Sequence, residues 1–247
     1  MDIGGFKWEP GVTPLSTPGS LAIGVAVYLV TVFGLKLVIR NPVTLPTWIA
    51  ATHNLILCIG SLIMFIGTAY ESAQVASDKN SIRWLFCLEP GTPMKGALYF
   101  WSYTYYLSKY YEFLDTVLLV LKAKPLSFLH VFHHSVVVVM SFLWLDAAQS
   151  LQQIALLTNT GIHVLMYYYY FMCTIKRPPR WKKLVTQSQI IQFVFSFAAS
   201  VPFWWMHATS QGCSGFGAIV FNAVFNFLLL LLFRNFHRIS YSSKKRT

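Results

Sequence analysis

Charged residues are scarce in this sequence. Of its 247 residues, 11% are Asp, Glu, Lys or Arg, whereas 55% are hydrophobic, and the mean hydropathy is +0.54. A soluble domain carries about 25% charged residues, so the composition excludes an ordinary soluble globular domain. Low-complexity tracts and convincing internal repeats are missing too, which leaves no sign of a fibrous or repeat architecture.

Polar stretches long enough for a separate soluble domain are also missing, because seven apolar runs occupy most of the chain. A membrane-spanning helix needs ~20 predominantly apolar residues, and each run comes close to that length. We therefore predict an all-α, polytopic membrane protein in which residues 1–247 form one membrane domain, with six or seven helices bundled together. The predicted spans are about 21–39, 48–70, 97–121, 127–145, 151–174, 185–206 and 216–236.

A basic segment of the kind that opens a secretory signal peptide is absent from the N-terminal region. Residues 1–20 contain Asp2 and Glu9 but only one basic residue, Lys7. A cleaved signal normally begins with a positively charged segment. We therefore expect the first apolar run to remain in the protein as its first span.

The basic residues are distributed unevenly between the two sides of the predicted membrane. Of the 19 Lys and Arg residues, 14 fall on the side of the C-terminus and four on the other side. Because cytosolic loops are enriched in Lys and Arg, we predict a cytosolic C-terminus. Lys244 and Lys245 resemble the dilysine retrieval signal of endoplasmic reticulum membrane proteins. The basic loops either reflect topology alone or also bind an anionic substrate, but they do not form the continuous face that nucleic acid requires.

Cysteine is also sparse, with four residues. Cys58 and Cys173 fall within predicted spans, where Cys behaves as a small buried hydrophobic residue. Cys87 and Cys213 fall in loops on the non-cytosolic side. The lumen of the endoplasmic reticulum is oxidising, so we predict a disulfide between Cys87 and Cys213.

Histidines, by contrast, gather within an apolar run. His130, His133 and His134 lie in the predicted span at about 127–145, and their i, i+3, i+4 spacing places them on one face of a helix. Burying imidazoles in hydrocarbon is costly, and ionisable residues inside a membrane usually serve a function. The sequence therefore predicts a functional site here.

A second polar cluster lies in the predicted span at about 97–121. Lys109, Glu112 and either Asp115 or Thr116 follow one another at helical spacing. A lysine and two carboxylates within two turns offset one another's charge. This cluster is either a buried ion pair that orders the bundle or part of the same site.

The two following spans carry further polar groups. Asn159 and His163 lie one turn apart, and Tyr167 and Tyr170 continue the same helix toward the cytosolic end. Glutamines in a membrane helix require inward-facing partners, and the span at about 185–206 contains three near its start: Gln187, Gln189 and Gln192. These groups all lie in the cytosolic half of the predicted membrane, where they can converge on one site.

The four clusters together resemble those of the ELO family of very-long-chain fatty acid elongases. That family carries K-x-x-E-x-x-D-T, H-x-x-H-H, H-x-x-M-Y-x-Y-Y and T-Q-x-Q-x-x-Q. All four occur here in family order, at 109–116, 130–134, 163–170 and 186–192. The resemblance covers about residues 21–240. It implies an endoplasmic reticulum enzyme that condenses acyl-CoA with malonyl-CoA to form 3-ketoacyl-CoA, CO2 and CoA, without a bound cofactor or metal.

The resemblance also implies roles for individual residues. We expect His133 to attack the thioester and form an acyl-imidazole. His134, His163 and Asn159 would stabilise oxyanions or move a proton, and His130 would orient its neighbours or bind the thioester. Residues expected to support these groups are Lys109, Glu112, Asp115, Tyr167, Tyr170, Gln189 and Gln192.

CoA carries several phosphates, and the two cytosolic loops that flank the His-bearing spans are basic. The residues expected to contact these phosphates are Lys122, Lys124, Arg177, Arg180, Lys182 and Lys183. The acyl tail would lie in a dry tunnel that closes toward the lumen. The implied partners are membrane lipid and the ketoreductase, dehydratase and enoyl reductase of the elongation cycle, and homodimerisation stays open.

Other functions give different expectations. A histidine-box desaturase or hydroxylase typically needs eight or more His ligands, whereas the chain has seven His in total. A seven-helix transporter would also explain buried ionisable groups, and a receptor or retinal protein would share the helix count. Within the family that this chain resembles, His rather than Gln at position 130 is typical of elongases of saturated and monounsaturated chains, although polyunsaturated substrates stay open.

Overall fold

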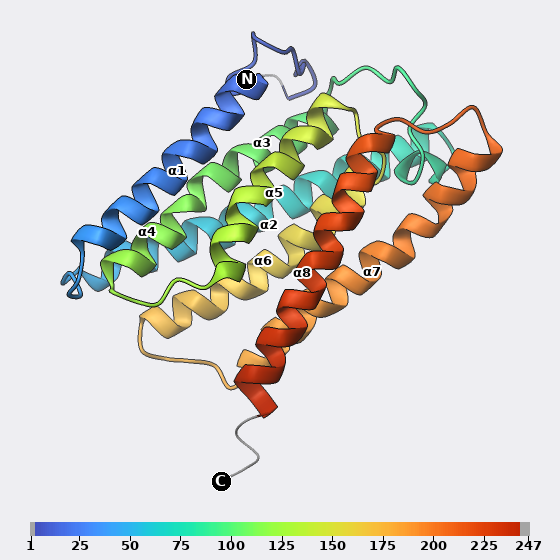
Figure 1. Cartoon of the computed structure of the whole chain (residues 1–247). Coiled ribbons are helices and arrows are strands. Elements are labelled where there is room, and N and C mark those ends of the chain that lie inside the picture. The colour runs from blue at the N-terminus through green and yellow to red at the C-terminus, as the bar shows by residue number, and fades with distance from the viewer. Residues whose placement is uncertain (1–2, 243–247) are drawn as a thin grey trace.

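The structure, a computed structural model, describes residues 3–242 as a bundle of α-helices (Figure 1). Within this range the chain has no β-strand, only one isolated bridge between Lys7 and Lys95. The prediction of an all-α fold is therefore confirmed. The elements are α1 (Pro18–Val38), α2 (Thr47–Asp78), η1 (Arg83–Leu85), α3 (Ala97–Tyr111), α4 (Phe113–Leu121), α5 (Phe128–Asp146), α6 (Gln152–Thr174), α7 (Lys182–Thr209) and α8 (Phe216–Ser242).

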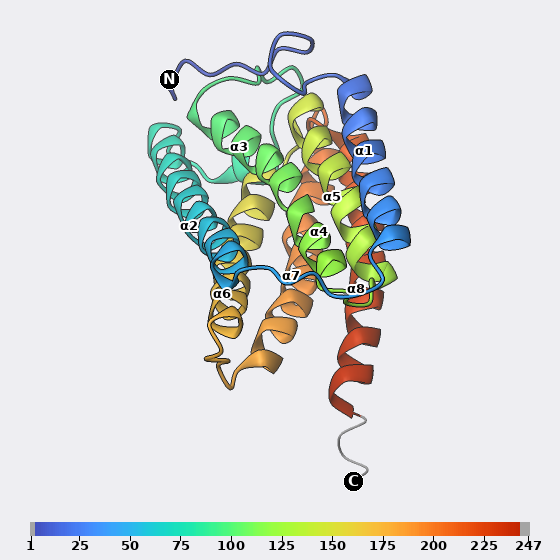
Figure 2. The same cartoon turned by 90° about the vertical axis from the view of Figure 1, so that its left-hand side faces the viewer.

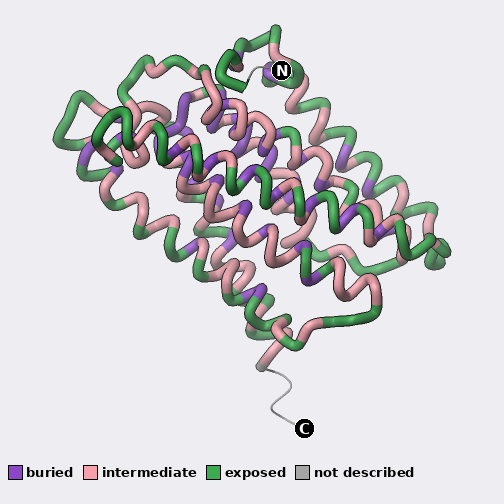
Figure 3. Tube along the Cα trace, turned by 180° about the vertical axis from the view of Figure 1, so that it is seen from behind, coloured by how far each residue is buried: buried purple, intermediate pink, exposed green. Residues whose placement is uncertain are grey.

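Five of these helices are long and apolar enough to cross a bilayer, namely α1, α2, α5, α7 and α8. Many outward side chains of α1, such as Ile23, Val27 and Leu37, are exposed although they are apolar. Figure 3 shows exposed positions along the outer faces of the bundle. Apolar residues on the outside of a helix bundle face lipid rather than water, and the protein is therefore a multi-pass membrane protein.

The span predicted at about 97–121 is not one continuous helix. α3 and α4 meet at Glu112, where the Asp115 N–H bonds to the Glu112 carbonyl at 3.0 Å, a one-residue-shorter turn than an α-helix makes. Such a tightened turn within a helix often marks a functional position. The break re-aims the side chains that follow it. Propensity did not reveal this break, since no Gly or Pro lies there.

Six helices form a closed ring. α2 packs along α6 and against α3, α3 packs on α5, α5 on α8, α8 on α7, and α7 on α6. α1 lies outside the ring against α4 and α5, and Figure 2 shows it at the edge opposite α2. The beginning of α1 and the end of α8 lie at opposite ends of the bundle (Figure 1), as an odd number of crossings requires.

Local sequence signals fix where two of the helices begin. Thr17 caps α1 in a capping box with Ser20, and Pro18 occupies the first turn. Ser127 caps α5, and its hydroxyl accepts the His130 N–H at 3.2 Å. The cap at Ser127 fixes where the helix that carries the three clustered histidines begins.

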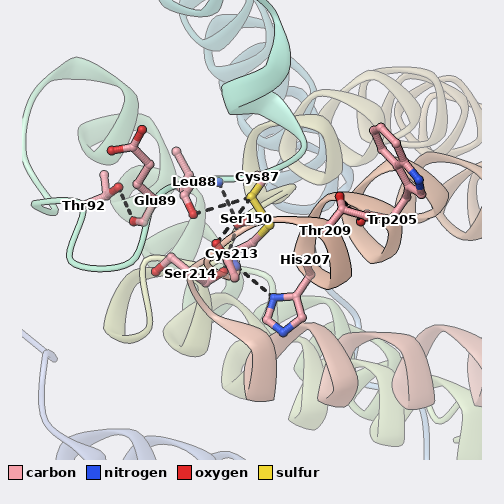
Figure 4. The surroundings of a disulfide bond; sticks show 11 residues. Cys87, Leu88, Glu89, Thr92, Ser150, Trp205, His207, Thr209, Cys213 and Ser214 are labelled. Carbon is pink, nitrogen blue, oxygen red and sulfur yellow. Dashed lines mark hydrogen bonds between the residues drawn. A yellow bond between two sulfur atoms is a disulfide. The ribbon is translucent and has the colours of Figure 1, made fainter.

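The end of the bundle at which α1 begins is closed by loops that are fastened together. A disulfide joins Cys87, after η1, to Cys213, before α8. Beside it, Ser150 Oγ accepts the Leu88 N–H at 3.0 Å and donates to the Ser214 carbonyl at 2.9 Å. Figure 4 shows these groups around the two sulfur atoms. Three chain segments far apart in sequence therefore form one cap.

We expect removal of this disulfide to destabilise the protein markedly. The bridge closes a loop with a sequence separation of 126 residues, and losing a native disulfide typically costs about 2–5 kcal/mol. The double variant Cys87→Ser/Cys213→Ser should unfold at a lower temperature in detergent, and reductant should lower the melting temperature of the unaltered protein to a similar value. Two freely labelled thiols at these positions in the native protein would contradict the bridge.

Candidate active site

The ring of six helices surrounds a cavity of about 550 Å3. Residues of α2, α3, α4, α5, α6, α7 and α8 line it. Its wall extends along α5 from Ser127 to Trp144 and along α8 from Asn222 to Phe236. At ~1.5 Å rise per residue, these stretches span roughly 25 Å and 21 Å. The cavity is thus a long tunnel parallel to the helices.

All three clustered histidines of α5 line the cavity. The His130 and His134 rings lie 4.4 Å apart between centroids, and the His133 and His134 rings 5.3 Å apart. His134 is buried, whereas His130 and His133 are half-buried. His130 Nε2 lies 2.9 Å from Thr116 Oγ1, which also bonds Tyr28 of α1. The ring of His133 makes no hydrogen bond to another described residue, and His134 Nδ1 also lacks a partner among them.

Asp115 links three helices at the wall of the cavity. Its Oδ1 lies 2.7 Å from His53 Nε2 of α2, and its Oδ2 accepts a hydrogen bond from the Tyr167 hydroxyl of α6 at 2.7 Å. Both carboxylate oxygens are therefore occupied by cavity-lining residues. Such a bridged carboxylate fixes the orientation of both partners.

Lys109 and Glu112 form an almost fully buried ion pair. Lys109 Nζ donates to Glu112 Oε1 at 2.6 Å, with the two side chains 1% and 2% exposed. The same oxygen lies 3.4 Å from His163 Nδ1. Glu112 and His163 line the cavity, whereas Lys109 stands behind them with its ammonium 4.1 Å from the centroid of the Tyr105 ring. The pair orders the bundle and, through Glu112, reaches the cavity.

The remaining motif residues gather along the same cavity. Asn159 Oδ1 accepts the Tyr105 hydroxyl at 2.8 Å, and Gln189 Nε2 contacts Met166 Sδ at 3.4 Å. Gln192 and Tyr170 also line the space. Residues from all four motifs, on four helices, thus contact one enclosed volume.

The basic residues expected to bind CoA phosphates divide into two groups. Lys122 and Lys182 line the cavity at the end where α4 stops and α7 begins. Lys124, Arg177, Arg180 and Lys183 are exposed at the same end without lining the cavity. Lys244 and Lys245, expected as a retrieval signal, lie outside the described residues.

Sequence reasoning missed several residues of this site. His53 and Asn54 of α2 line the cavity, and His53 bonds directly to Asp115. Both are buried polar residues inside an apolar run, so the rule that drew attention to the histidines of α5 also applied to them. The sequence does not distinguish Tyr105 and Tyr28 from the many other aromatic residues. Only tertiary packing shows that their hydroxyls bond Asn159 and Thr116.

Several histidines and carboxylates line this cavity, and such side chains can bind metal ions. Within residues 3–242, no group of three or more His, Cys, Asp or Glu side chains is arranged to hold a metal ion. Most of the histidines concerned instead contact protein groups through their ring nitrogens or ring faces.

Comparison with known proteins identifies the family of the chain. Residues 13–247 match the model of the ELO (GNS1/SUR4) family. The chain belongs to the ELO family. An ELO relative named as a putative fatty acid elongase, from Dictyostelium discoideum, is 38% identical over 97% of this chain and 81% of its own length. A further D. discoideum relative, named fatty acid elongase sre1, is 37% identical over 98% of this chain and 90% of its own length.

ELO relatives also occur outside that organism. An Arabidopsis thaliana protein named fatty acid elongase 3-like is 28% identical over 98% of this chain and 89% of its own length. These matches span almost the full chain, including all four motifs. The cavity described above is therefore the region in which this ELO protein holds the residues that mark the family.

Proposed function

We propose that this protein is the condensing enzyme of fatty acid elongation, an acyltransferase that forms 3-ketoacyl-CoA. Acyl-CoA and malonyl-CoA give a 3-ketoacyl-CoA two carbons longer, with release of CO2 and CoA. The observation that carries the proposal is a long, enclosed cavity with an unpaired imidazole, His133, on its wall. Family membership and relatives named fatty acid elongases support it.

The first half-reaction is acyl transfer to His133. A ring nitrogen attacks the thioester carbonyl, the C–S bond breaks, and CoA leaves as a thiolate that takes up a proton. Covalent catalysis of this kind divides one difficult step into two easier ones. His134 and His163, which lie beside His133 in the cavity, are suited to donate hydrogen bonds to the oxyanion or to protonate the leaving thiolate.

The second half-reaction joins the carbon atoms. Malonyl-CoA loses CO2, and the electron pair of that C–C bond forms an enolate. The enolate carbon attacks the acyl carbonyl, the C–N bond to His133 breaks, and the imidazole is restored. Glu112 and Asp115 keep His163 and His53 oriented during both steps, since each carboxylate contacts one of these rings.

The two ends of the cavity suit the two ends of an acyl-CoA. Lys122 and Lys182 at one end, with Lys124, Arg177, Arg180 and Lys183 nearby, provide positive charge for CoA phosphates. From His133 to Trp144 the lining continues for 11 residues of α5, roughly 16 Å, which accommodates a long alkyl chain. This arrangement supports a cytosolic C-terminus in the endoplasmic reticulum membrane, where acyl-CoA enters from the cytosol.

The product defines the partners. A 3-ketoacyl-CoA returns to a saturated chain by reduction, dehydration and a second reduction. We therefore propose a ketoreductase, a dehydratase and an enoyl reductase as working partners in the same membrane. The substrates are acyl-CoA and malonyl-CoA, with no bound cofactor.

The test is incorporation of radiolabelled malonyl-CoA by the purified protein with a panel of saturated, monounsaturated and polyunsaturated acyl-CoAs. We expect label in a 3-ketoacyl-CoA two carbons longer than the acyl substrate, with one CoA and one CO2 released from each malonyl-CoA and acyl-CoA pair. A folded sample that incorporates no label with any member of the panel would contradict the proposal.

A further inference from the structure

A second, smaller pocket adjoins the main cavity. This pocket of about 50 Å3 shares part of its lining with the main cavity and continues toward the cap. The main cavity holds the catalytic groups, whereas the second pocket is lined by residues that no motif contains, including Leu151 and Trp204. The shared residues are Ala155, Thr158, Ser196, Asn222 and Asn226.

Two buried amides on this lining lack hydrogen-bond partners. Gln149, 1% exposed, lines the second pocket, and neither its Oε1 nor its Nε2 has a partner among the described residues. Asn222, 9% exposed, lines both pockets, and its Oδ1 has no partner there either. Buried polar side chains are nearly always hydrogen-bonded, and leaving them unpaired against hydrocarbon is costly. A polar occupant of this small pocket would supply both amides with the partner that they lack.

The cap holds Gln149 in place. Its neighbour Ser150 bonds both Leu88 and Ser214 beside the disulfide (Figure 4). On the other side, Gly215 packs so closely on the Gln149 backbone that no larger residue fits without displacement. The amide is thus presented by a rigid frame, as a binding group requires.

The position of this pocket defines which part of a substrate reaches it. Under the proposed function the acyl carbon is attached at His133, and the lining of α5 runs roughly 16 Å from there to Trp144. The second pocket adjoins the main cavity through Asn222 and reaches Gln149 beside the cap, so it lies at the end of the cavity that is expected to hold the methyl end of a long chain. An alkyl chain offers amides neither a donor nor an acceptor, whereas a hydroxyl group offers both.

We propose that the pocket of Gln149 and Asn222 binds a hydroxyl group near the methyl end of the acyl chain. The protein would then elongate terminally hydroxylated acyl-CoAs in preference to unsubstituted acyl-CoAs of the same length. This inference rests on the proposed function for its turnover readout, but the pocket itself can be tested by binding. The hydroxyl is recognised and stays chemically unchanged.

The experiment compares acyl-CoAs with and without a terminal hydroxyl across a series of chain lengths. At the length that reaches the pocket, kcat/KM for the hydroxylated chain should be about tenfold higher, as one or two additional buried hydrogen bonds provide. Asn222→Leu and Gln149→Leu should each bring the ratio of the two rates toward one. Gln74→Leu, the same amide-to-apolar change on the exposed side of α2, should keep the ratio of the unaltered protein.

A second measurement separates this inference from the proposed function. Thermal stabilisation by terminally hydroxylated fatty acids and by plain fatty acids is measured in the unaltered protein and in Asn222→Leu. Stronger stabilisation by the hydroxylated ligand, lost in Asn222→Leu, supports the pocket even if no acyl-CoA is elongated, in which case only the proposed function fails. Equal rates at every length, equal stabilisation, or a preference that survives both variants would overturn the inference and leave ordered water as the occupant.

Discussion

Under the proposed function, we expect the His133→Ala variant to form 3-ketoacyl-CoA at least about 10³-fold more slowly than the unaltered protein, the scale expected when a nucleophile is removed. Its imidazole lines the cavity and makes no hydrogen bond to another described residue, unlike His53, which bonds Asp115, and His130, which bonds Thr116. The measurement is turnover with labelled malonyl-CoA. Loss of turnover should occur without loss of folding, because the side chain is only half-buried and anchors no network.

A matched variant separates a loss of catalysis from a general loss of folding. His237 of α8 does not line the cavity and contacts Tyr241, with ring centroids 4.9 Å apart. His237→Ala removes an imidazole that lies outside the cavity, and this variant should retain most of the turnover. Unchanged turnover in His133→Ala would show that another group attacks the thioester.

The second large effect concerns the stability of the buried Lys109–Glu112 pair. Lys109→Met or Glu112→Gln leaves one charge in the interior without its partner. Breaking a buried pair in this way typically costs about 3–5 kcal/mol. Each single variant should therefore unfold at much lower temperature or denaturant concentration in detergent, whereas the double variant Lys109→Met/Glu112→Gln should recover part of the loss.

An exposed carboxylate provides the control for these single and double variants. Glu89 lies on the surface of the loop before α3, and Glu89→Gln should change the unfolding free energy by no more than about 0.5 kcal/mol. Single variants at the pair that unfold like the unaltered protein, or a double variant that loses the full sum of the two, would show that the charges do not stabilise each other.

The sequence allowed the fold class and the grouping of the motifs to be predicted for definite physical reasons. Long apolar runs with few charges have no stable alternative to membrane helices. Polar residues within such runs must face inward, so motifs on α3, α5, α6 and α7 share one interior. The oxidising lumen supplied the reason to pair Cys87 with Cys213, which the structure joins.

Features that depend on contacts between distant segments could not be predicted in the same way. The break at Glu112 and the contacts of that side chain with Lys109 and His163 are not revealed by hydropathy. The sequence leaves open whether Lys109 and Glu112 order the bundle or belong to the site. In the structure Glu112 does both, because it pairs with Lys109 and also lines the cavity. The orphaned amides of Gln149 and Asn222 stand out only once their surroundings are known to offer no partner.

The covalent acyl group proposed on His133 is tested most directly by peptide mass analysis of the protein after incubation with acyl-CoA alone. We predict the release of one CoA per protein and the mass of one acyl group on the peptide containing His133, which then disappears as 3-ketoacyl-CoA when malonyl-CoA is added. An unmodified peptide under conditions in which malonyl-CoA is consumed, or an acyl group attached elsewhere that chases into product, would contradict the account.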